Sequence, residues 1–307
     1  MLNLDCIRYM YEFAKRKLCY KGTVRKYMDK LLLVDGSNLF FQMFFGMPAR
    51  IVNSQGKAIQ GTLGFVGALL KVIRKVEPTH ILVVFDGEHE NSRCEIDADY
   101  KANRIDYSMV KEEENPFSQL PDVYKALDYL DINYIETTDC EADDMITSYA
   151  LSFCNDTEIV ICSFDSDFFQ LISERISILR YRGEKTMICS SQYIIDRYGI
   201  YPDQYAYFKS LVGDTADNIK GAEKIGVKTA ASLLGTFGTL ENIISNVENI
   251  DKPSIKKSIV ENTDRIRKNY KLIKLEKNQL LQYDKCDLKY MNTGKTATEV
   301  LKEIGIK

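Results

Sequence analysis

Acidic side chains crowd one short stretch of this 307-residue chain. The segment 139–150 reads DCEADDMITSYA and places Glu141, Asp143 and Asp144 within four positions. One interpretation is structural, because Thr138 and Glu141 have the spacing of a capping box and acidic side chains stabilise a first helical turn. The other is chemical, because carboxylate oxygens gathered at one place bind divalent cations. The three acids lie off the apolar face of the predicted helix, so the segment alone leaves both interpretations open.

Further aspartates follow three apolar runs that read as strands. The runs LLLV, HILVVF and EIVIC are continuous and rich in β-branched residues, which is typical of parallel strands buried on both faces. Helical patterns at 61–76, 122–131 and 142–153 alternate with them, so we expect an α/β fold with a mostly parallel sheet covered by helices. Ligands bind beyond the carboxyl ends of such strands. The aspartates at those ends are Asp35, Asp86, Asp165 and Asp167.

The carboxylates expected at this edge of the sheet would repel one another unless cations lay between them. Sites built from oxygen ligands favour Mg²⁺ or Mn²⁺. The chain has only two histidines, and its eight cysteines include no C-x-x-C pair, so a histidine or zinc mechanism is poorly supplied. We therefore favour the chemical interpretation, an oxygen-rich metal site.

The composition bounds the class of protein. A hydrophobic content of 45% with 28% charged residues is typical of a globular protein. No apolar run approaches the roughly 20 residues of a membrane span. The cysteine pattern is that of a reducing compartment, so we expect a cytoplasmic protein that does not contact the membrane.

Basic and aromatic residues gather in two further segments. The segment 91–117 is long and polar, and its cations and aromatic ring could contact phosphates and stack a base, although a solvated loop is equally open. The residues concerned are Arg93, Tyr100, Lys101 and Arg104. The segment 211–234 has a glycine-rich turn before a helix expected from about Val227, where backbone N–H groups could bind a phosphate. The residues there are Lys220, Gly221, Lys224, Gly226 and Lys228.

Two more acids, Asp214 and Asp217, precede the glycine turn. If that stretch is helical, their i, i+3 spacing places both on one face. The simpler interpretation of the whole segment is an αα-hairpin with an ordinary capping glycine.

The order and spacing of five motifs resemble one enzyme family over about 30–247. The motifs are LLLVDG, VVFDG with DYKANR, CEADDM, DSDFFQLI and GDTADNIKGAEKIGVKTA. The chain resembles the bacterial and phage 5′-nucleases, which include the 5′–3′ exonuclease domain of DNA polymerase I and the flap endonucleases. The resemblance implies a stand-alone, monomeric, metal-dependent nuclease. Its substrate would be DNA with a 5′ flap, a nick or a gap, cut near the 5′ end during replication and repair.

The resemblance also implies roles for particular residues, with two or more Mg²⁺ or Mn²⁺ ions. The first metal site would use Asp35, Asp86, Glu141, Asp143 and Asp144. The second would use Asp165, Asp167, Asp214 and Asp217. Lys101 and Arg104 match the catalytic basic residues of the family's helical arch, and Tyr100 matches its stacking aromatic. The glycine turn matches the helix–three-turn–helix element, which grips duplex DNA and often a K⁺ ion.

Two positions depart from the family pattern. Lys224 stands where a further glycine is usual, which bears on the turn geometry and the K⁺ site. Ser166 stands where a lysine is common, which removes a phosphate contact but no metal ligand.

The implied organisation has four parts. Residues 1–27 form a basic extension, and 28–200 an α/β nuclease domain with the arch at about 90–117. Residues 201–280 form a helical DNA-binding region, and 281–307 a tail. Two alternatives stay open: a DNA-junction binding protein with weak catalysis, and a related metal-dependent ribonuclease. The complete set of carboxylates disfavours the first, and the arch and glycine turn disfavour the second.

The basic extension lies upstream of every motif. We expect a chain that begins at Met28 to fold and to cleave a 5′-flap substrate at close to the full-length rate. The loss of seven basic residues should cost only nonspecific affinity at low salt. Single-turnover rates and melting temperatures of the two chains would test this, and a sharp fall in melting temperature would contradict it.

Overall fold

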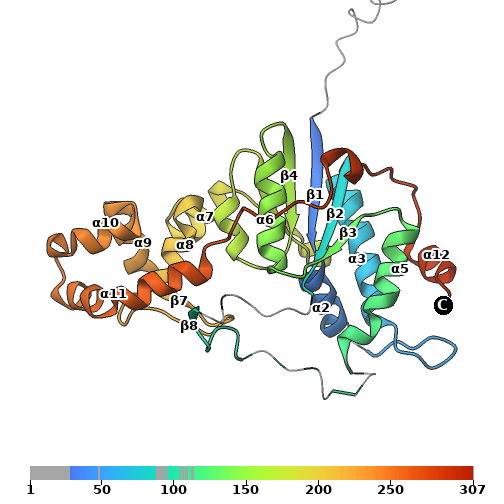
Figure 1. The fold of residues 1–307 in the computed structure, drawn as a ribbon, viewed down its shortest axis with the longest axis horizontal. Coiled ribbons are helices and arrows are strands. Elements are labelled where there is room, and N and C mark those ends of the chain that lie inside the picture. Colours follow the sequence, from blue (N-terminus) through green and yellow to red (C-terminus); the bar gives the residue numbers. More distant parts are fainter. Residues whose placement is uncertain are drawn as a thin grey trace, which may run out of the picture.

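The computed structural model describes residues 28–47, 49–87, 93, 96–103, 105, 107, 110–111 and 114–306. At its centre is a six-stranded sheet with the order β3-β2-β1-β4-β5-β6 (Figure 1). The strands are β1 (Asp29–Asp35), β2 (His80–Phe85), β3 (Tyr134–Glu136), β4 (Thr157–Cys162), β5 (Ile176–Arg180) and β6 (Met187–Cys189). Neighbouring strands are parallel except for β6, which runs antiparallel to β5. The predicted α/β fold with a mostly parallel sheet is confirmed.

The continuous apolar runs of the strands are explained by burial on both faces. Leu31 and Leu33 of β1 pack in a cluster with α6 (Ala142–Phe153). Leu32 and Val34 pack on the opposite face in a cluster with α2 (Gly36–Gly46), α3 (Gln60–Val76) and α5 (Leu120–Tyr129). Because successive side chains of a strand point to opposite faces, a strand between two helical layers is apolar at every position.

The cluster on the α6 face continues into a helical part that extends to one side of the sheet (Figure 1). Its helices are α7 (Ser191–Tyr198), α8 (Tyr205–Val212), α9 (Val227–Phe237), α10 (Leu240–Ser245) and α11 (Pro253–Ile273). Short 3-10 helices lie between the main elements: η1 (Pro116–Gln119), η2 (Asp167–Leu171), η3 (Gly183–Lys185), η4 (Pro202–Gln204), η5 (Val247–Asn249) and η6 (Lys285–Leu288).

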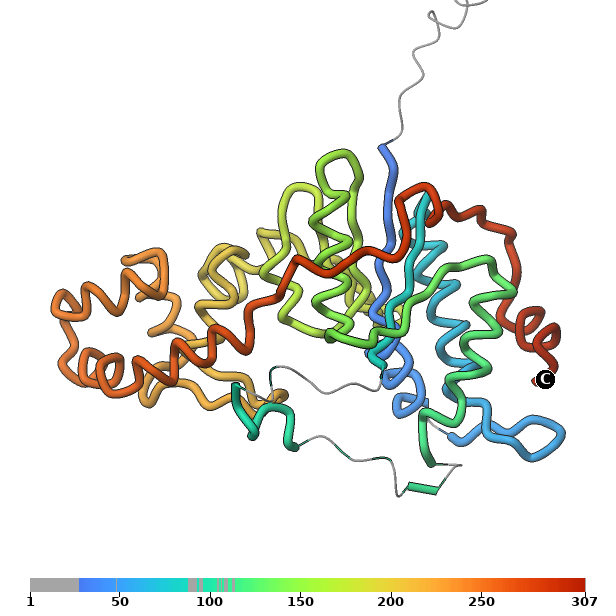
Figure 2. The backbone as a smooth tube through the Cα atoms, in the orientation of Figure 1, coloured from blue at the N-terminus to red at the C-terminus, as the bar shows by residue number. Residues whose placement is uncertain are grey.

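The C-terminal segment connects the two parts. It runs back from α11 across the sheet and ends in α12 (Ala297–Glu303), beside α3 and α5 (Figure 2). On the way it forms a β-bridge between His80 and Lys289. Three backbone groups of this segment bond to α6: the N–H groups of Glu276, Gln279 and Tyr283 donate to side chains of that helix. The position of α6 is therefore fixed by hydrogen bonds from the C-terminal segment as well as by packing in the core.

Some elements differ from the sequence-based expectation. The short strands β3, β5 and β6 were not predicted, because three to five residues carry little periodicity. Asp214 and Asp217 do not share a helical face: Asp214 ends β7 (Gly213–Asp214), and Asp217 lies in the turn before β8 (Ile219–Lys220). Within the described residues, no helix is long and apolar enough to cross a membrane.

Candidate metal centre

The strand-end aspartates lie at one edge of the sheet because the strands are parallel and in register. Asp35 pairs with Val84 of β2, and Val34 pairs with Cys162 of β4. Asp35 caps α2 by accepting a hydrogen bond from the Asn38 backbone N–H at 3.0 Å, and its other oxygen accepts one from Ser163 at 2.8 Å. Burial and the neighbouring Asp86 carboxylate raise the pKa of Asp35 to about 8. A carboxyl group in this setting gains from a nearby cation.

Asp86 follows β2 and is exposed at the same edge. Its Oδ1 accepts a hydrogen bond from the backbone N–H of Ala142 at 2.9 Å, at the first residue of α6. Its own backbone N–H donates to Ser37 at 2.9 Å. Asp86 thus joins the end of β2 to the beginnings of α2 and α6, and its carboxylate faces the site rather than the core.

The three acids of the DCEADDM motif surround an arginine. Glu141 is the N-cap residue of α6 without a capping hydrogen bond from its side chain, so the capping box does not form. Its carboxylate pairs instead with Arg93 and Lys101. Arg93 also lies 2.8 Å from Asp144 Oδ1 and 3.5 Å from Asp143 Oδ1. Burial raises the pKa of Asp143 to about 7, although Arg93 acts in the opposite direction. These acids are thus tied to cations and do not form a solvated cap.

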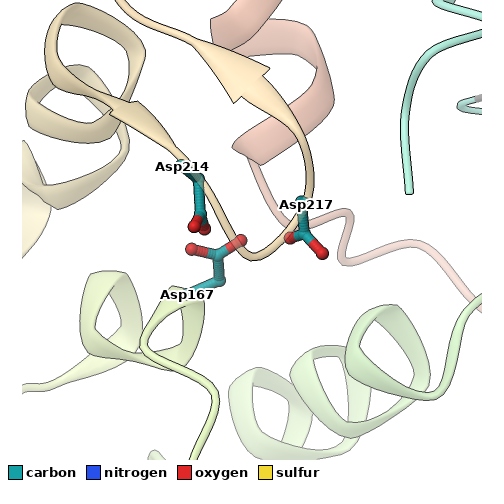
Figure 3. A group of neighbouring side chains, drawn as sticks. All are labelled: Asp167, Asp214 and Asp217. Carbon is teal, nitrogen blue, oxygen red and sulfur yellow. The ribbon is translucent and has the colours of Figure 1, made fainter. Parts of the chain in front are cut away.

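A second acidic group lies beside the first, where η2 meets the β7–β8 hairpin. One carboxylate oxygen from each of Asp167, Asp214 and Asp217 lies within 4.8 Å of the others (Figure 3). Asp165 adjoins them, because its Oδ1 accepts a hydrogen bond from the Asp167 backbone N–H at 2.8 Å. Burial raises the pKa of Asp167 to about 8, although Lys209 lowers it. Three converging carboxylate oxygens fit a divalent cation by charge and donor type.

Lys209 of α8 is buried between two members of this group. Its ammonium pairs with both Asp167 and Asp214. Burial lowers the pKa of Lys209, but the two carboxylates outweigh burial and hold that pKa well above its ordinary value. Lys209 was not predicted as a site residue, because a lysine within YFKSLV is typical of the polar position of an amphipathic helix.

The first limb of the predicted arch, residues 96–103, packs against the β7–β8 hairpin and α11. Tyr100 is buried with Ile219 and Leu272, so its ring is not open to a base in this arrangement. The Lys101 backbone N–H donates to the Asp217 carbonyl at 3.1 Å, while its ammonium contacts Glu141. Lys101 therefore touches both acidic groups. Arg104 lies outside the described residues.

A cavity of about 1490 Å³ opens beside these groups. Its lining includes carboxylates of the first group and Asp165, together with Lys101 and Arg182. Aromatic rings form another part of its wall and were not predicted from the sequence. Its rings belong to Phe41, Phe45, Tyr107 and Phe117. The i, i+4 pair Phe41 and Phe45 in NLFFQMFFG was the available signal for this wall.

The glycine turn joins the β7–β8 hairpin to α9. A Cβ at Gly221 would lie 2.2 Å from the Val212 carbonyl oxygen, so only glycine fits there. Gly226 is the N-cap residue of α9 and has open space around it. The three predicted DNA-binding lysines of this region are all exposed: Lys220, Lys224 and Lys228. Their ammonium groups are accessible to a phosphate backbone.

Lys224 has a φ of 62°, in the left-handed region where glycine is favoured. We expect Lys224→Gly to raise the free energy of unfolding by up to about 1 kcal/mol through relief of this strain. Glu223→Gly is the matched control, because Glu223 does not have a positive φ. It should lower stability. Urea denaturation would measure both, and a loss of stability in Lys224→Gly would contradict the strain.

Comparison with known proteins decides the family. Residues 30–199 match the family model of the 5′–3′ exonuclease N-terminal resolvase-like domain, and 200–296 match the 5′–3′ exonuclease C-terminal SAM fold. The chain belongs to the 5′–3′ exonuclease family. It is 31% identical over 266 residues to a 5′–3′ exonuclease of Aquifex aeolicus, covering 85% of this chain and 87% of that protein.

The family also includes parts of longer proteins. The chain is 30% identical over 256 residues to the thermostable DNA polymerase I of Thermus thermophilus, covering 83% of this chain and 30% of the polymerase. It is 33% identical over 237 residues to DNA polymerase I of Streptococcus pneumoniae, covering 75% of this chain and 26% of that polymerase. The chain thus spans less than a third of the length of these polymerases.

Solved structures share the fold of this exonuclease-family chain. The zinc-bound 5′-exonuclease of bacteriophage T5 matches with a TM-score of 0.66 and 22% identity, covering 80% of this chain and 89% of that one. The catalytic core of Rad2 in complex with DNA matches with a TM-score of 0.57 and 17% identity, covering 90% and 91%. At these identities the likeness establishes the common architecture.

Proposed function

We propose that this chain is a metal-dependent 5′-nuclease that hydrolyses phosphodiester bonds near the 5′ ends of flapped, nicked or gapped DNA. The observation that carries the proposal is the pair of acidic groups beside a cavity whose lining includes Lys101 and Arg182. Membership of the 5′–3′ exonuclease family supports the reaction, and the exposed lysines of the glycine turn support a duplex DNA partner. We infer a monomer in a reducing cytoplasm. The five described cysteines are all free thiols, which supports the reducing environment.

The acidic residues would hold two or more Mg²⁺ or Mn²⁺ ions. The first set would be Asp35, Asp86, Glu141, Asp143 and Asp144. The second would be Asp165, Asp167, Asp214 and Asp217. Such ions, when bound, supply a water that is nucleophilic near neutral pH and stabilise the leaving oxygen. A K⁺ ion at the glycine turn belongs to the same proposal, although Lys224 occupies a position where the family usually has glycine.

The basic residues of the arch would act on the substrate. Lys101 and Arg104 would stabilise negative charge on the scissile phosphate in the transition state. The Lys101 ammonium lies on Glu141, so substrate binding must exchange this contact for one to phosphate. Tyr100 would need to leave its buried position to stack on a base. The arch would therefore reorganise when DNA binds.

We also propose the division at residue 200 between the nuclease domain and the helical DNA-binding region. The two family models meet between 199 and 200, which supports this boundary. The helical region would continue to about 280, with 281–307 as a tail, and residues 1–27 would be dispensable.

Comparing cleavage of a 5′-flap DNA with cleavage of single-stranded RNA of the same sequence tests the substrate class. We expect Mg²⁺-dependent products from the flap, mapped to the junction, and slower cleavage of the RNA. Faster cleavage of the RNA would favour the ribonuclease alternative.

Lys220 and Lys228 provide a test of the duplex-binding surface. We expect Lys220→Ala and Lys228→Ala each to weaken DNA binding and to make its salt dependence shallower, by roughly 0.9 in slope for each phosphate that the variant no longer neutralises. Lys257→Ala is a control, because Lys257 is an exposed lysine of α11 that pairs with Glu261. Unchanged slopes in both turn variants would move the duplex site elsewhere.

A further inference from the structure

The guanidinium of Arg93 is buried among the acids at the start of α6. The residue is 5% exposed. Nη2 lies 2.8 Å from Asp144 Oδ1, Nη1 lies 3.5 Å from Asp143 Oδ1, and Nη1 also pairs with Glu141. One planar side chain thus bridges three carboxylates, for which the fork of donors on arginine is well suited. Arg93 was predicted to contact DNA, and in this structure its guanidinium pairs with the acids of the proposed first metal site.

The carboxylates around Arg93 do not converge as those of the second acidic group do. In the part of the chain that the structure describes, only Asp167, Asp214 and Asp217 bring three carboxylate oxygens within 4.8 Å of one another. Glu141, Asp143 and Asp144 do not form such a set, and the Arg93 guanidinium lies among them. A divalent ion and this guanidinium would neutralise the same oxygens. The ion and the guanidinium cannot both occupy the space between these three carboxylates.

The carboxylates have other anchors that do not depend on Arg93. Asp144 Oδ1 also accepts a hydrogen bond from the Glu276 backbone N–H at 2.8 Å. The start of α6 is held by Asp86 through the Ala142 N–H. Asp144 and the start of α6 therefore keep these anchors without Arg93, and we take the main contribution of Arg93 to be its charge.

We propose that Arg93 competes with the divalent ion for Glu141, Asp143 and Asp144, and that the ion binds by displacing the guanidinium. This rests on the proposed metal-dependent function. Arg93 acts through the carboxylates, because its guanidinium occupies their oxygens until an ion arrives. The apparent affinity of the first metal site then depends on how much more strongly the carboxylates bind the ion than the guanidinium. It is weaker than the affinity of the same carboxylates without Arg93.

Calorimetric titration of the full chain with Mn²⁺, in the absence of DNA, tests the competition. We expect Arg93→Gln to tighten one of the Mn²⁺ sites by at least about tenfold, because a full charge within 4 Å of the ligands is removed. The Mn²⁺ affinity of Arg93→Lys should fall between those of the unmodified chain and Arg93→Gln, since an ammonium bridges three carboxylates less well than a guanidinium. Circular dichroism melting would establish that each variant is folded. If the glutamine variant does not fold, the lysine variant carries the test.

Arg182→Gln is the matched control. Arg182 lines the same cavity and lies over the Phe164 ring at 5.3 Å, so this variant removes an equal charge nearby. Its Mn²⁺ affinity should stay within about twofold of the unmodified chain, since an exposed charge is screened. Equal tightening in Arg182→Gln would show a general charge effect and would overturn the competition.

Unchanged or weaker Mn²⁺ binding in folded Arg93 variants would also overturn it, because Arg93 would then shape the site rather than compete for it. That result would leave the proposed nuclease function intact. If the unmodified chain bound no Mn²⁺ or Mg²⁺, the metal assignment would fail, and the competition with it.

Discussion

Replacing Asp86 by alanine is expected to abolish cleavage of a 5′-flap substrate while leaving the fold and DNA binding largely intact. Asp86 lies at the exposed end of β2, outside the core, so its loss creates no cavity. Loss of a residue that only orients metal ligands typically lowers activity or metal affinity by about 10–100-fold. Asp86 is a proposed ligand itself, so we expect its loss to lower the single-turnover rate by at least about a hundredfold.

Two further variants separate charge from structure at this position. Asp86→Asn keeps an oxygen that can accept the Ala142 N–H, so α6 should stay in place while the charge is lost. It should be nearly as inactive as the alanine variant. Asp139→Ala removes an exposed carboxylate two residues before Glu141 and should be nearly normal. Near-normal turnover of Asp86→Ala in Mg²⁺ would contradict the metal assignment.

Lys101→Ala is expected to slow the chemical step by about 10²–10³-fold, with a much smaller effect on duplex affinity. The backbone N–H that donates to the Asp217 carbonyl remains in alanine, so the limb 96–103 should stay docked. The loss is therefore that of the ammonium beside Glu141, which would act on the scissile phosphate.

Single-turnover rates and dissociation constants, measured on the same flap substrate, separate the effect on the chemical step from the effect on affinity. Lys111→Ala is a suitable control, because it removes an exposed lysine of the same segment. If Lys101→Ala lost affinity alone and kept its rate at saturation, the residue would serve binding and not catalysis.

The sequence predicted the sheet and the strand-end aspartates because both follow from local patterns. A continuous apolar run identifies a doubly covered strand, and parallel strands bring their carboxyl ends to one edge. Asp35 and Asp86 could therefore be placed without knowledge of any contact. The family motifs then extended the site to Asp214 and Asp217, although the helical geometry expected for them was wrong.

The cations within the acidic groups were not predictable in the same way. Arg93 meets Glu141 across 48 residues and Lys209 meets Asp167 across 42, and nothing local distinguishes either from a solvated side chain. Tyr100 is similar: its burial depends on Ile219 and Leu272, which lie more than a hundred positions away. Such contacts depend on tertiary packing, which local periodicity does not encode.

The most direct test of the nuclease assignment is single-turnover cleavage of a 5′-flap DNA by the unmodified chain as Mg²⁺ is raised from zero. We predict no product in a chelator and a rate that rises with Mg²⁺ to saturation, with cuts near the flap junction. Tight, structure-specific binding of the flap without cleavage at any Mg²⁺ or Mn²⁺ concentration would contradict this assignment and would identify a DNA-junction binding protein.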